Sequence, residues 1–378
     1  MNKYSAKIQK VGGSNLLSSK DLKLFDKLLK KNTITVISAA NGLSKAISED
    51  IDSVSNSNQE FHEYKFISKA KSFINSSEID LKSTYFETLS SYNKALNSYR
   101  RLKKNSTLMP SYIIDKLLSY GEMFTIKFIK QELNSKGKKC RHFDSSRYFV
   151  TNNDYGNASP NKGQIDSTFQ DFLKMDSQSP IIMEGFIGRS DEGRPSTMGF
   201  ESSNLTASVM ASIVGSPSIT IYTDTSGIYE ADPKLFNFAE IVDEINLFDA
   251  RAIAGSGSRI LNERSISDSI LHGIELKYDS LEGETRTRLN NTCNTSKSLI
   301  SYYRESSDLI SVLLIKNDLK RLPELIEHIS GITEDVQIRS IVETGSKLVS
   351  FELEKGSKKV VEQLHALIKG NRITQLSE

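Results

Sequence analysis

Residues 5–14 read SAKIQKVGGS and residues 33–44 read TITVISAANGLS, and these two stretches decide the fold. In each stretch an apolar, β-rich run ends in a glycine turn, which is typical of a strand followed by a tight connection. Residues 20–31, between them, carry leucines and a phenylalanine at helical spacing. Strand, glycine turn, helix and strand in this order predict the start of a parallel α/β sheet.

The middle of the chain continues this pattern. Residues 51–130 have few glycines and repeat Leu, Ile, Phe and Tyr at helical spacing, so we predict mostly helix, interrupted at Pro110 and at residues 119–121. Further strands are predicted at residues 147–151, 179–186 and 218–223. The helix predicted over residues 204–214 has Ser203 or Asn204 as its N-terminal cap.

The last part of the chain has a different pattern of predicted strands and helices. We predict strands at residues 308–315, 336–342, 347–353 and 372–376, with helices at residues 319–329 and 358–369. This is a compact βαββαβ unit of about 75 residues, and the serine-rich, charged stretch 294–307 is its predicted junction. We therefore expect two domains, residues 1–303 and residues 304–378.

Composition excludes several functional classes. The 378 residues include 49 basic and 47 acidic side chains, and a net charge of +2 gives no reason to expect nucleic acid or a membrane surface as a partner. Cys140 and Cys293 have no CxxC spacing, so neither a disulfide framework nor a metal cluster is expected. The N-terminus lacks the apolar core of a signal peptide and no membrane-length apolar stretch occurs, which predicts a cytoplasmic protein.

Three glycine-containing turns follow predicted strands, at residues 12–14, 41–44 and 199–204. Glycine lets a backbone approach a phosphate closely, and N–H groups at the start of a helix are ready anion donors. Lys10 stands just before the first turn, where its ammonium would meet a phosphate. Such turns also serve as plain tight connections, but three of them with a lysine favour phosphate binding. No GxxxxGK[ST] motif is present, which disfavours a P-loop protein.

A polar loop, residues 222–233 (YTDTSGIYEADP), follows the strand predicted at residues 218–223. Thr223 and Asp224 lie where the carboxyl end of a strand contacts ligands in α/β sheets. The alternative is an aspartate-rich turn with ordinary capping.

Seven segments in the same order resemble aspartokinases. They are KVGGS (residues 10–14), VISAANGLS (36–44), SYGE (119–122), VTNNDYGNA (150–158), GFIGRSDEGRPSTMGFESSN (185–204), YTDTSGIYEADP (222–233) and GSRIL (257–261). The resemblance implies the amino-acid-kinase fold, an αβα sandwich around a largely parallel, eight-stranded sheet, followed here by a small α+β, ACT-like βαββαβ domain. It also implies ATP and Mg²⁺ as cofactors and a small amino-acid acceptor.

The resemblance also implies roles for individual residues. The transferring phosphate would be held by Lys10, Gly12, Gly13, Ser14, Gly199, Ser203 and Asn204, with Lys10, Ser203 and Asn204 as the catalytic group. The nucleotide would be held by Thr223, Asp224, Tyr229, Lys234 and Arg259, the last two standing where the family has arginine and lysine. The acceptor would meet Ser44, Glu122 and Phe200, with Glu122 on its amino group.

One loop departs from the family. Where aspartokinases have GRGGSD, residues 199–204 read GFESSN. Phe200 replaces the arginine that binds a carboxylate of aspartate, a bidentate pair worth about 1.5–3 kcal/mol, and its loss lowers affinity about ten- to a hundredfold. Asn204 replaces an aspartate, and Glu201 and Ser202 replace two glycines, which predicts a different loop path.

Three functional hypotheses follow from this pattern. The first is a kinase that phosphorylates the side-chain carboxylate of aspartate, and the second is a kinase of the same fold with another amino-acid-like acceptor in a specialised pathway. The third is a non-catalytic homologue that binds nucleotide or amino acid and regulates a partner. Aspartokinases usually carry two ACT domains, whereas this tail fits one, which could pair with its copy in a homodimer. Effector binding and a purely structural dimerisation role both remain open.

Overall fold

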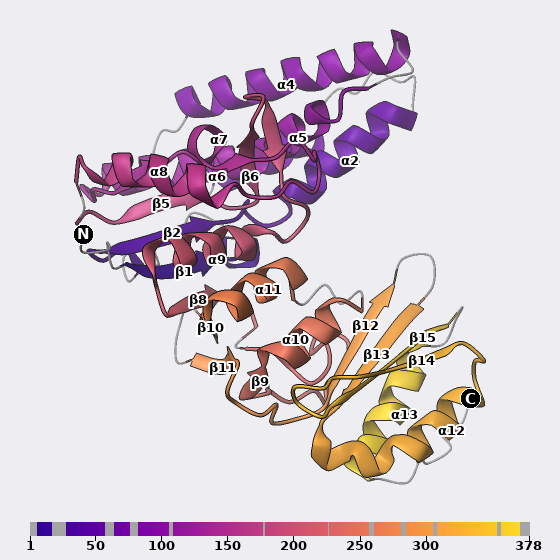
Figure 1. Cartoon of the computed structure of the whole chain (residues 1–378). Helices are drawn as coiled ribbons and strands as arrows, with labels where there is room; N and C mark the ends of the chain where they lie inside the picture. The colour runs from indigo at the N-terminus through magenta and orange to yellow at the C-terminus, as the bar shows by residue number, and fades with distance from the viewer. Residues whose placement is uncertain are drawn as a thin grey trace. The chain divides into compact units, whose positions relative to one another are not determined.

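The computed structural model describes residues 6–16, 28–56, 64–75, 82–105, 109–176, 178–225, 227–256, 261–280, 285–304, 308–353 and 357–370 (Figure 1). The chain divides into two compact units, residues 1–224 and residues 225–378. None of the helices within the described ranges is both long enough and apolar enough to cross a membrane. Most of the helix predicted at residues 20–31 lies outside the described residues.

The first unit is organised around five parallel strands in the order β3–β5–β2–β1–β8. Their bounds are β1 Lys7–Val11, β2 Thr33–Ile37, β3 Arg141–Phe143, β5 Ile181–Glu184 and β8 Ser218–Tyr222. Every residue of the central strand β2 is buried, because helices cover both faces of a parallel sheet. Strand β1, which precedes the first glycine turn, pairs directly with β2. The two predicted strands are thus neighbours in the sheet.

Helices and a small second sheet complete the first unit. The helices are α2 Leu43–Asn56, α3 Lys65–Asn75, α4 Lys82–Asn105, α5 Tyr112–Leu118, α6 Tyr120–Ser135, α7 Ser145–Tyr148, α8 Lys162–Leu173 and α9 Ser203–Val214. The small sheet has the order β4–β6–β7, with bounds Val150–Thr151, Ile187–Ser190 and Pro195–Thr197. Helix α9 is buried almost all round and packs against β1, β2 and β8 (Figure 1).

The strand predicted at residues 147–151 is only partly correct. Residues 145–148 form the short helix α7, because the Asp144 side chain accepts a hydrogen bond from the Ser146 N–H at 3.1 Å and caps its start. Only Val150 and Thr151 pair as a strand, with β6.

The second unit begins with three strands and two helices. Their bounds are β9 Glu244–Asn246, α10 Leu247–Ala254, α11 Glu263–His272, β10 Glu275–Asp279 and β11 Thr285–Asn290. Strand β11 pairs antiparallel with β10 and parallel with β9. With the five strands of the first unit, these make up the eight strands expected for the αβα sandwich, and the predicted α/β class with a largely parallel sheet is confirmed.

The rest of the second unit is a four-stranded antiparallel sheet in the order β12–β13–β15–β14. Its elements are β12 Leu299–Arg304, β13 Asp308–Leu314, the 3₁₀ helix η3 Lys316–Arg321, α12 Leu322–Ser330, β14 Val336–Ser340, β15 Lys347–Leu353 and α13 Ser357–Lys369. Helices α12 and α13 share one hydrophobic core with alternate strand residues such as Val312, Val349 and Phe351. The predicted order strand, helix, strand, strand, helix is present, and the last strand predicted at residues 372–376 lies outside the described residues.

The stretch predicted as a junction contains a strand that the sequence analysis missed. Residues 299–304 form β12 and pair with β13, because Ile300 and Tyr302 point into the core of this domain. The domain boundary predicted after residue 303 stays a prediction.

The first glycine turn has no room for a side chain. A Cβ atom added to Gly13 would lie 2.2 Å from the Ala39 carbonyl oxygen, so we expect Gly13→Ala to lower the unfolding midpoint by several degrees. Gly163→Ala near the start of α8 is the matched control, because its nearest neighbour would be 3.8 Å away. Thermal unfolding by circular dichroism measures both, and equal midpoints for the two variants would contradict this close approach.

Candidate functional site

The carboxyl ends of parallel strands meet at one edge of the first unit. Strands β1, β2, β5 and β8 are neighbours, so the residues that follow Val11, Ile37, Glu184 and Tyr222 converge there. This edge is where open α/β sheets place their ligands. The predicted phosphate turns after β1 and β2 both belong to it.

The turn after β1 is a 3₁₀ turn over Gly13–Asn15. The Gly12 N–H donates to the Tyr222 carbonyl at 3.1 Å, and the Asn15 side-chain amide donates to the same oxygen at 2.8 Å. A Cβ atom on Gly12 would lie 3.5 Å from Lys10 Nζ and 3.6 Å from Ser14 Oγ. The Lys10 ammonium therefore lies over the turn, whose first N–H groups have no partner within the turn itself.

Lys10 has an unusual protonation equilibrium for a lysine. Burial lowers the pKa of Lys10 to about 8, and the negative charge of Glu201 opposes that shift. The amine is still mainly an ammonium at neutral pH, but its partial burial removes part of its hydration. A poorly hydrated cation over backbone donors is well suited to bind phosphate oxygens.

The amino end of helix α9 contributes a second group of donors. A Cβ atom on Gly185 would lie 2.5 Å from Ser203 Oγ, so the end of β5 and the start of α9 are in direct contact. Helix N-termini carry partial positive charge and attract anions. The predicted cap was wrong, because Ser202 and not Ser203 or Asn204 is the N-cap residue, and it makes no side-chain capping bond. Ser202 Oγ and Asn204 Oδ1 are buried without a hydrogen-bond partner among the described residues.

The loop before α9 follows an unusual path. Gly199 and Glu201 have positive φ angles of 87° and 61°, and such a conformation is strained for a glutamate. Phe200 is 65% exposed and its ring stacks on Phe186, with centroids 6.2 Å apart. The loop therefore presents an aromatic face where the resembling family has a guanidinium.

A buried carboxylate lies next to the first glycine turn. Glu122 is 3% exposed, and its Oε1 accepts a hydrogen bond from the Ala39 N–H at 3.2 Å. Its Oε2 is buried without a hydrogen-bond partner among the described residues. Because Gly13 packs on the carbonyl of the same Ala39, the turn and this carboxylate share one residue as support. Ser44 Oγ would lie 3.5 Å from a Cβ on Gly121, which brings Ser44 beside Glu122.

Burial raises the pKa of Glu122 to about 8, and the negative charge of Glu184 adds to the shift. An unpaired oxygen on a buried carboxylate is costly unless a ligand supplies a donor. A ligand ammonium would satisfy Oε2 and would favour the charged carboxylate. This part of the site is therefore suited to an amine.

The buried Glu184 pairs with the partly buried His142, and the sequence analysis singled out neither residue. Glu184 Oε1 lies 2.8 Å from His142 Nε2, and Glu184 Oε2 accepts from the Ser145 N–H at 2.9 Å. His142, Asp144 and Glu184 each offer one atom, and these atoms lie within 4.8 Å of one another. Both oxygens of Glu184 and one of Asp144 already accept hydrogen bonds, so this cluster is accounted for without an ion. Glu184 lies near the end of the strand predicted at residues 179–186. A carboxylate at that place is the feature by which the sequence could have pointed to this residue.

The predicted nucleotide residues divide between the units. Thr223 and Asp224 follow β8 at the end of the first unit, half-buried and exposed respectively. Tyr229 and Lys234 belong to the second unit, where Tyr229 pairs with Ile241 and the Lys234 N–H donates to Asp232 Oδ1 at 2.9 Å. Arg259 lies outside the described residues.

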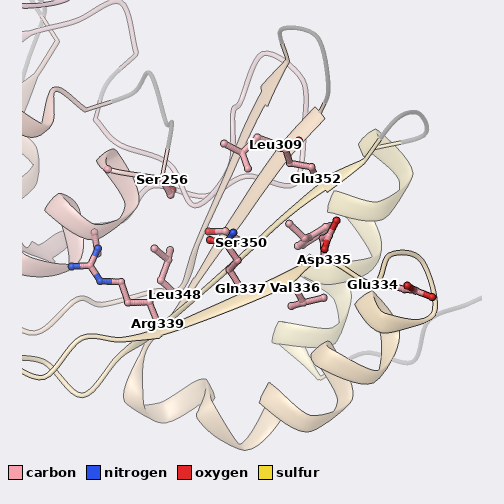
Figure 2. A pocket seen from close by; sticks show the side chains of 13 residues that line it. Ser256, Leu309, Glu334, Asp335, Val336, Gln337, Arg339, Leu348, Ser350 and Glu352 are labelled. Carbon is pink, nitrogen blue, oxygen red and sulfur yellow. The ribbon is translucent and has the colours of Figure 1, made fainter.

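A cavity of ≈ 870 Å³ is lined by residues of the second unit alone. Figure 2 shows Leu309, Leu348 and Ser350 on the sheet, with Arg339 at one end. These strand residues alternate with those of the hydrophobic core, so the cavity lies on the opposite face of the four-stranded sheet. Its lining contains none of the residues predicted for phosphoryl transfer.

Comparison with known proteins shows which family the chain resembles. The sequence matches the Amino acid kinase family over residues 6–267, more than half of the chain. The lysine-sensitive aspartokinase 3 of Escherichia coli is 27% identical over 159 residues, 42% of this chain and 35% of that protein. An aspartokinase of Geobacillus stearothermophilus is 25% identical over 247 residues, 64% of this chain and 60% of that protein. The chain thus spans about a third to three-fifths of these relatives' lengths.

The folds agree over a larger part. The structure of E. coli aspartokinase III in complex with aspartate and ADP superposes with a TM-score of 0.68 and 17% identity, covering 96% of this chain and 84% of that one. At this identity the likeness concerns the fold alone. It agrees with the predicted combination of an amino-acid-kinase sheet and a C-terminal α+β domain.

The buried carboxylate predicts a pH-dependent stability. Because the pKa of Glu122 rises from 4.5 to about 8 on folding, the folded chain keeps a proton that the unfolded chain releases in that window. Stability should therefore fall as pH rises from 4.5 to 8, and Glu122→Gln should raise the unfolding midpoint by a few degrees at pH 8 but not at pH 4.5. Glu132→Gln, in the same helix, removes a buried carboxylate paired with Lys136 at 3.7 Å and should give no such gain. Parallel pH–stability curves for Glu122→Gln and the wild type would contradict the assignment.

Proposed function

The chain belongs to the amino acid kinase family, and from that premise we propose that it transfers the terminal phosphoryl group of ATP to the side-chain carboxylate of aspartate, forming an acyl phosphate. One observation carries the proposal. The half-buried ammonium of Lys10 lies over a glycine turn that packs on Ala39, whose N–H donates to the buried, half-satisfied carboxylate of Glu122. A phosphate-binding group and an amine-binding group are thereby supported by one residue.

The phosphate half of the reaction needs positioning and charge stabilisation. Lys10 would neutralise charge on the transferring phosphoryl group, while the N–H groups of Gly13, Ser14 and the start of α9 at Ser203 would bind its oxygens. The N–H of Gly12 already donates to the Tyr222 carbonyl and so does not bind phosphate. Gly12 would instead contribute its small size, which leaves room for the phosphate. Gly199 would give the loop before α9 its positive φ angle.

ATP fits this set of donors, since a lysine and helix N-termini are the groups that hold phosphates in proteins. The resemblance assigns the nucleotide to Thr223, Asp224, Tyr229, Lys234 and Arg259. Mg²⁺ would accompany the nucleotide and neutralise charge on its phosphate oxygens. The E. coli structure, which holds aspartate and ADP, supports the use of an adenine nucleotide.

The acceptor half would use Glu122 for the amino group of the amino acid and Ser44 for a hydrogen bond. The attacking atom is a side-chain carboxylate oxygen of the acceptor, and the leaving group is ADP. The relatives named aspartokinases support aspartate as the acceptor.

A second acceptor class is favoured by Phe200. This side chain is exposed and stacked on Phe186, so it offers an apolar surface and no charge to a carboxylate. Glu201 adds a negative charge close enough to act on Lys10. An amino-acid-like acceptor whose α-carboxylate is absent or masked would avoid both costs.

We also propose a cytoplasmic homodimer that forms through the C-terminal domain. Strand β14 is the last strand of its sheet, and Ile338 on it is 48% exposed. An unpaired strand edge with exposed apolar side chains is suited to pairing with a second copy.

Lys10→Ala should abolish phosphoryl transfer, with a loss of about a hundredfold or more, because it removes the side-chain cation proposed to neutralise charge on the transferring phosphoryl group. ADP release from Mg·ATP with aspartate, with hydroxylamine to trap the acyl phosphate, measures it. Lys7→Ala, on the exposed start of the same strand, should keep full activity. In the wild type, kcat/KM for ATP should fall as pH rises above about 8, where Lys10 loses its proton. Retained activity in Lys10→Ala would exclude the phosphate assignment.

Phe200→Arg combined with Asn204→Asp should lower KM for aspartate about ten- to a hundredfold, because it restores a charge-assisted carboxylate contact. The same assay with a panel of aspartate analogues and other amino acids separates the acceptor classes. Turnover with another compound and not with aspartate would favour the second class. Silence with every compound would leave a non-catalytic regulatory homologue as the best description.

A further inference from the structure

The segment 229–240, which carries the proposed nucleotide residues Tyr229 and Lys234, is built into the C-terminal domain. Ala231 is 1% exposed and Phe236 is 2% exposed, and both belong to the hydrophobic core formed by β13, β15, α12 and α13. The Phe236 ring contacts Tyr302 of β12, with centroids 6.4 Å apart. Two apolar side chains on either side of Lys234 are thus anchored in this core.

A buried carboxylate held by two less buried basic side chains makes the second anchor. Glu230 is 3% exposed, and its Oε1 lies 2.9 Å from His365 Nε2 and its Oε2 lies 3.0 Å from Lys369 Nζ. Both partners belong to α13 and are one helical turn apart. Burial raises the pKa of Glu230, but the hydrogen bonds from His365 and Lys369 outweigh it and hold that pKa below its ordinary value.

The backbone of the segment depends on the same anchors. The Glu230 carbonyl accepts from the Ile300 N–H at 2.6 Å, and the Glu230 N–H donates to the Glu240 carbonyl at 2.9 Å. The Phe238 ring stacks on the His365 imidazole at 4.0 Å. One end of α13 therefore contacts both ends of the segment.

Glu230 is the buried member of this group, so removing either basic partner leaves one of its carboxylate oxygens without its hydrogen-bond donor, which is costly for a buried carboxylate. Without His365 or Lys369, Glu230 would turn toward water and shift its neighbour Tyr229. The exposed Lys234 lies between the anchors Ala231 and Phe236, and the half-buried Tyr229 directly precedes the anchor Glu230. Their positions follow from the anchors on α13.

We propose that His365 and Lys369 of α13 are positioning residues for nucleotide binding: they hold the segment 229–240 in the shape that presents Tyr229 and Lys234 to ATP. This inference rests on the proposed kinase function. It gives the C-terminal domain a role in the catalytic cycle of a single chain, besides any role in dimerisation or effector binding.

The test uses the full chain with His365→Ala, Lys369→Met and the conservative Lys369→Arg. We expect the first two to weaken binding of a non-hydrolysable Mg·ATP analogue by about tenfold, with kcat at saturating ATP and KM for the acceptor unchanged. Lys369→Arg should recover most of the affinity. His328→Ala is the matched control. It removes a histidine of α12 that lies 3.2 Å from Gln363 of α13, and so perturbs the same helix at a contact outside the segment 229–240. It should bind the analogue as the wild type does.

Amide hydrogen exchange gives a readout that does not depend on the nucleotide. In His365→Ala, the amides of Glu230 and Ile300 should lose protection, while those of β13 and β15 keep theirs. If both His365→Ala and Lys369→Met bind the analogue as tightly as the wild type, the positioning role is overturned but the proposed kinase function is not. Unchanged exchange protection of Glu230 and Ile300 in His365→Ala would overturn the positioning role in the same way. A wild-type chain that fails to bind the analogue would instead overturn the proposed kinase function itself.

Discussion

The candidate site depends on the contact between Gly13 and Ala39. Because Gly13 has no side chain, the turn after β1 can rest on the Ala39 carbonyl, and the N–H of the same residue donates to Glu122. The carbonyl and the N–H of one residue thus link the turn proposed to bind phosphate to the carboxylate proposed to bind an amine. Any atom added at Gly13 would separate the two halves of the proposed reaction, and no other residue type fits there.

Two displaced protonation equilibria show the cost of this arrangement. The pKa of Lys10 falls to about 8 and the pKa of Glu122 rises to about 8, in each case chiefly because burial disfavours the charged form. Burying either group in its charged form therefore lowers the stability of the fold. The same charged forms are suited to bind ligands of opposite charge. Such tension between stability and binding is typical of functional sites.

The C-terminal domain packs against the segment 229–240 that precedes it in the chain. Phe236 and Ala231 lie in its hydrophobic core, and Glu230 bonds to its last helix. A domain that shares core residues with the segment proposed to bind nucleotide can affect that segment in the absence of any effector. This explains why residues 225–378 form one compact unit, although the sequence changes texture only near residue 303.

The sequence by itself determined the fold class, the glycine turns and the family, because apolar periodicity and short motifs are local properties of the chain. It did not determine that β12 is a strand, that Ser202 is the N-cap residue of α9, or that Glu184 pairs with His142, since these depend on neighbours distant along the chain. Only the tertiary structure decided that one oxygen of Glu122 has no hydrogen-bond partner within the described part of the chain and that α13 anchors the segment 229–240. Burial and pairing of charges are set by three-dimensional packing, which spacing along a chain does not encode.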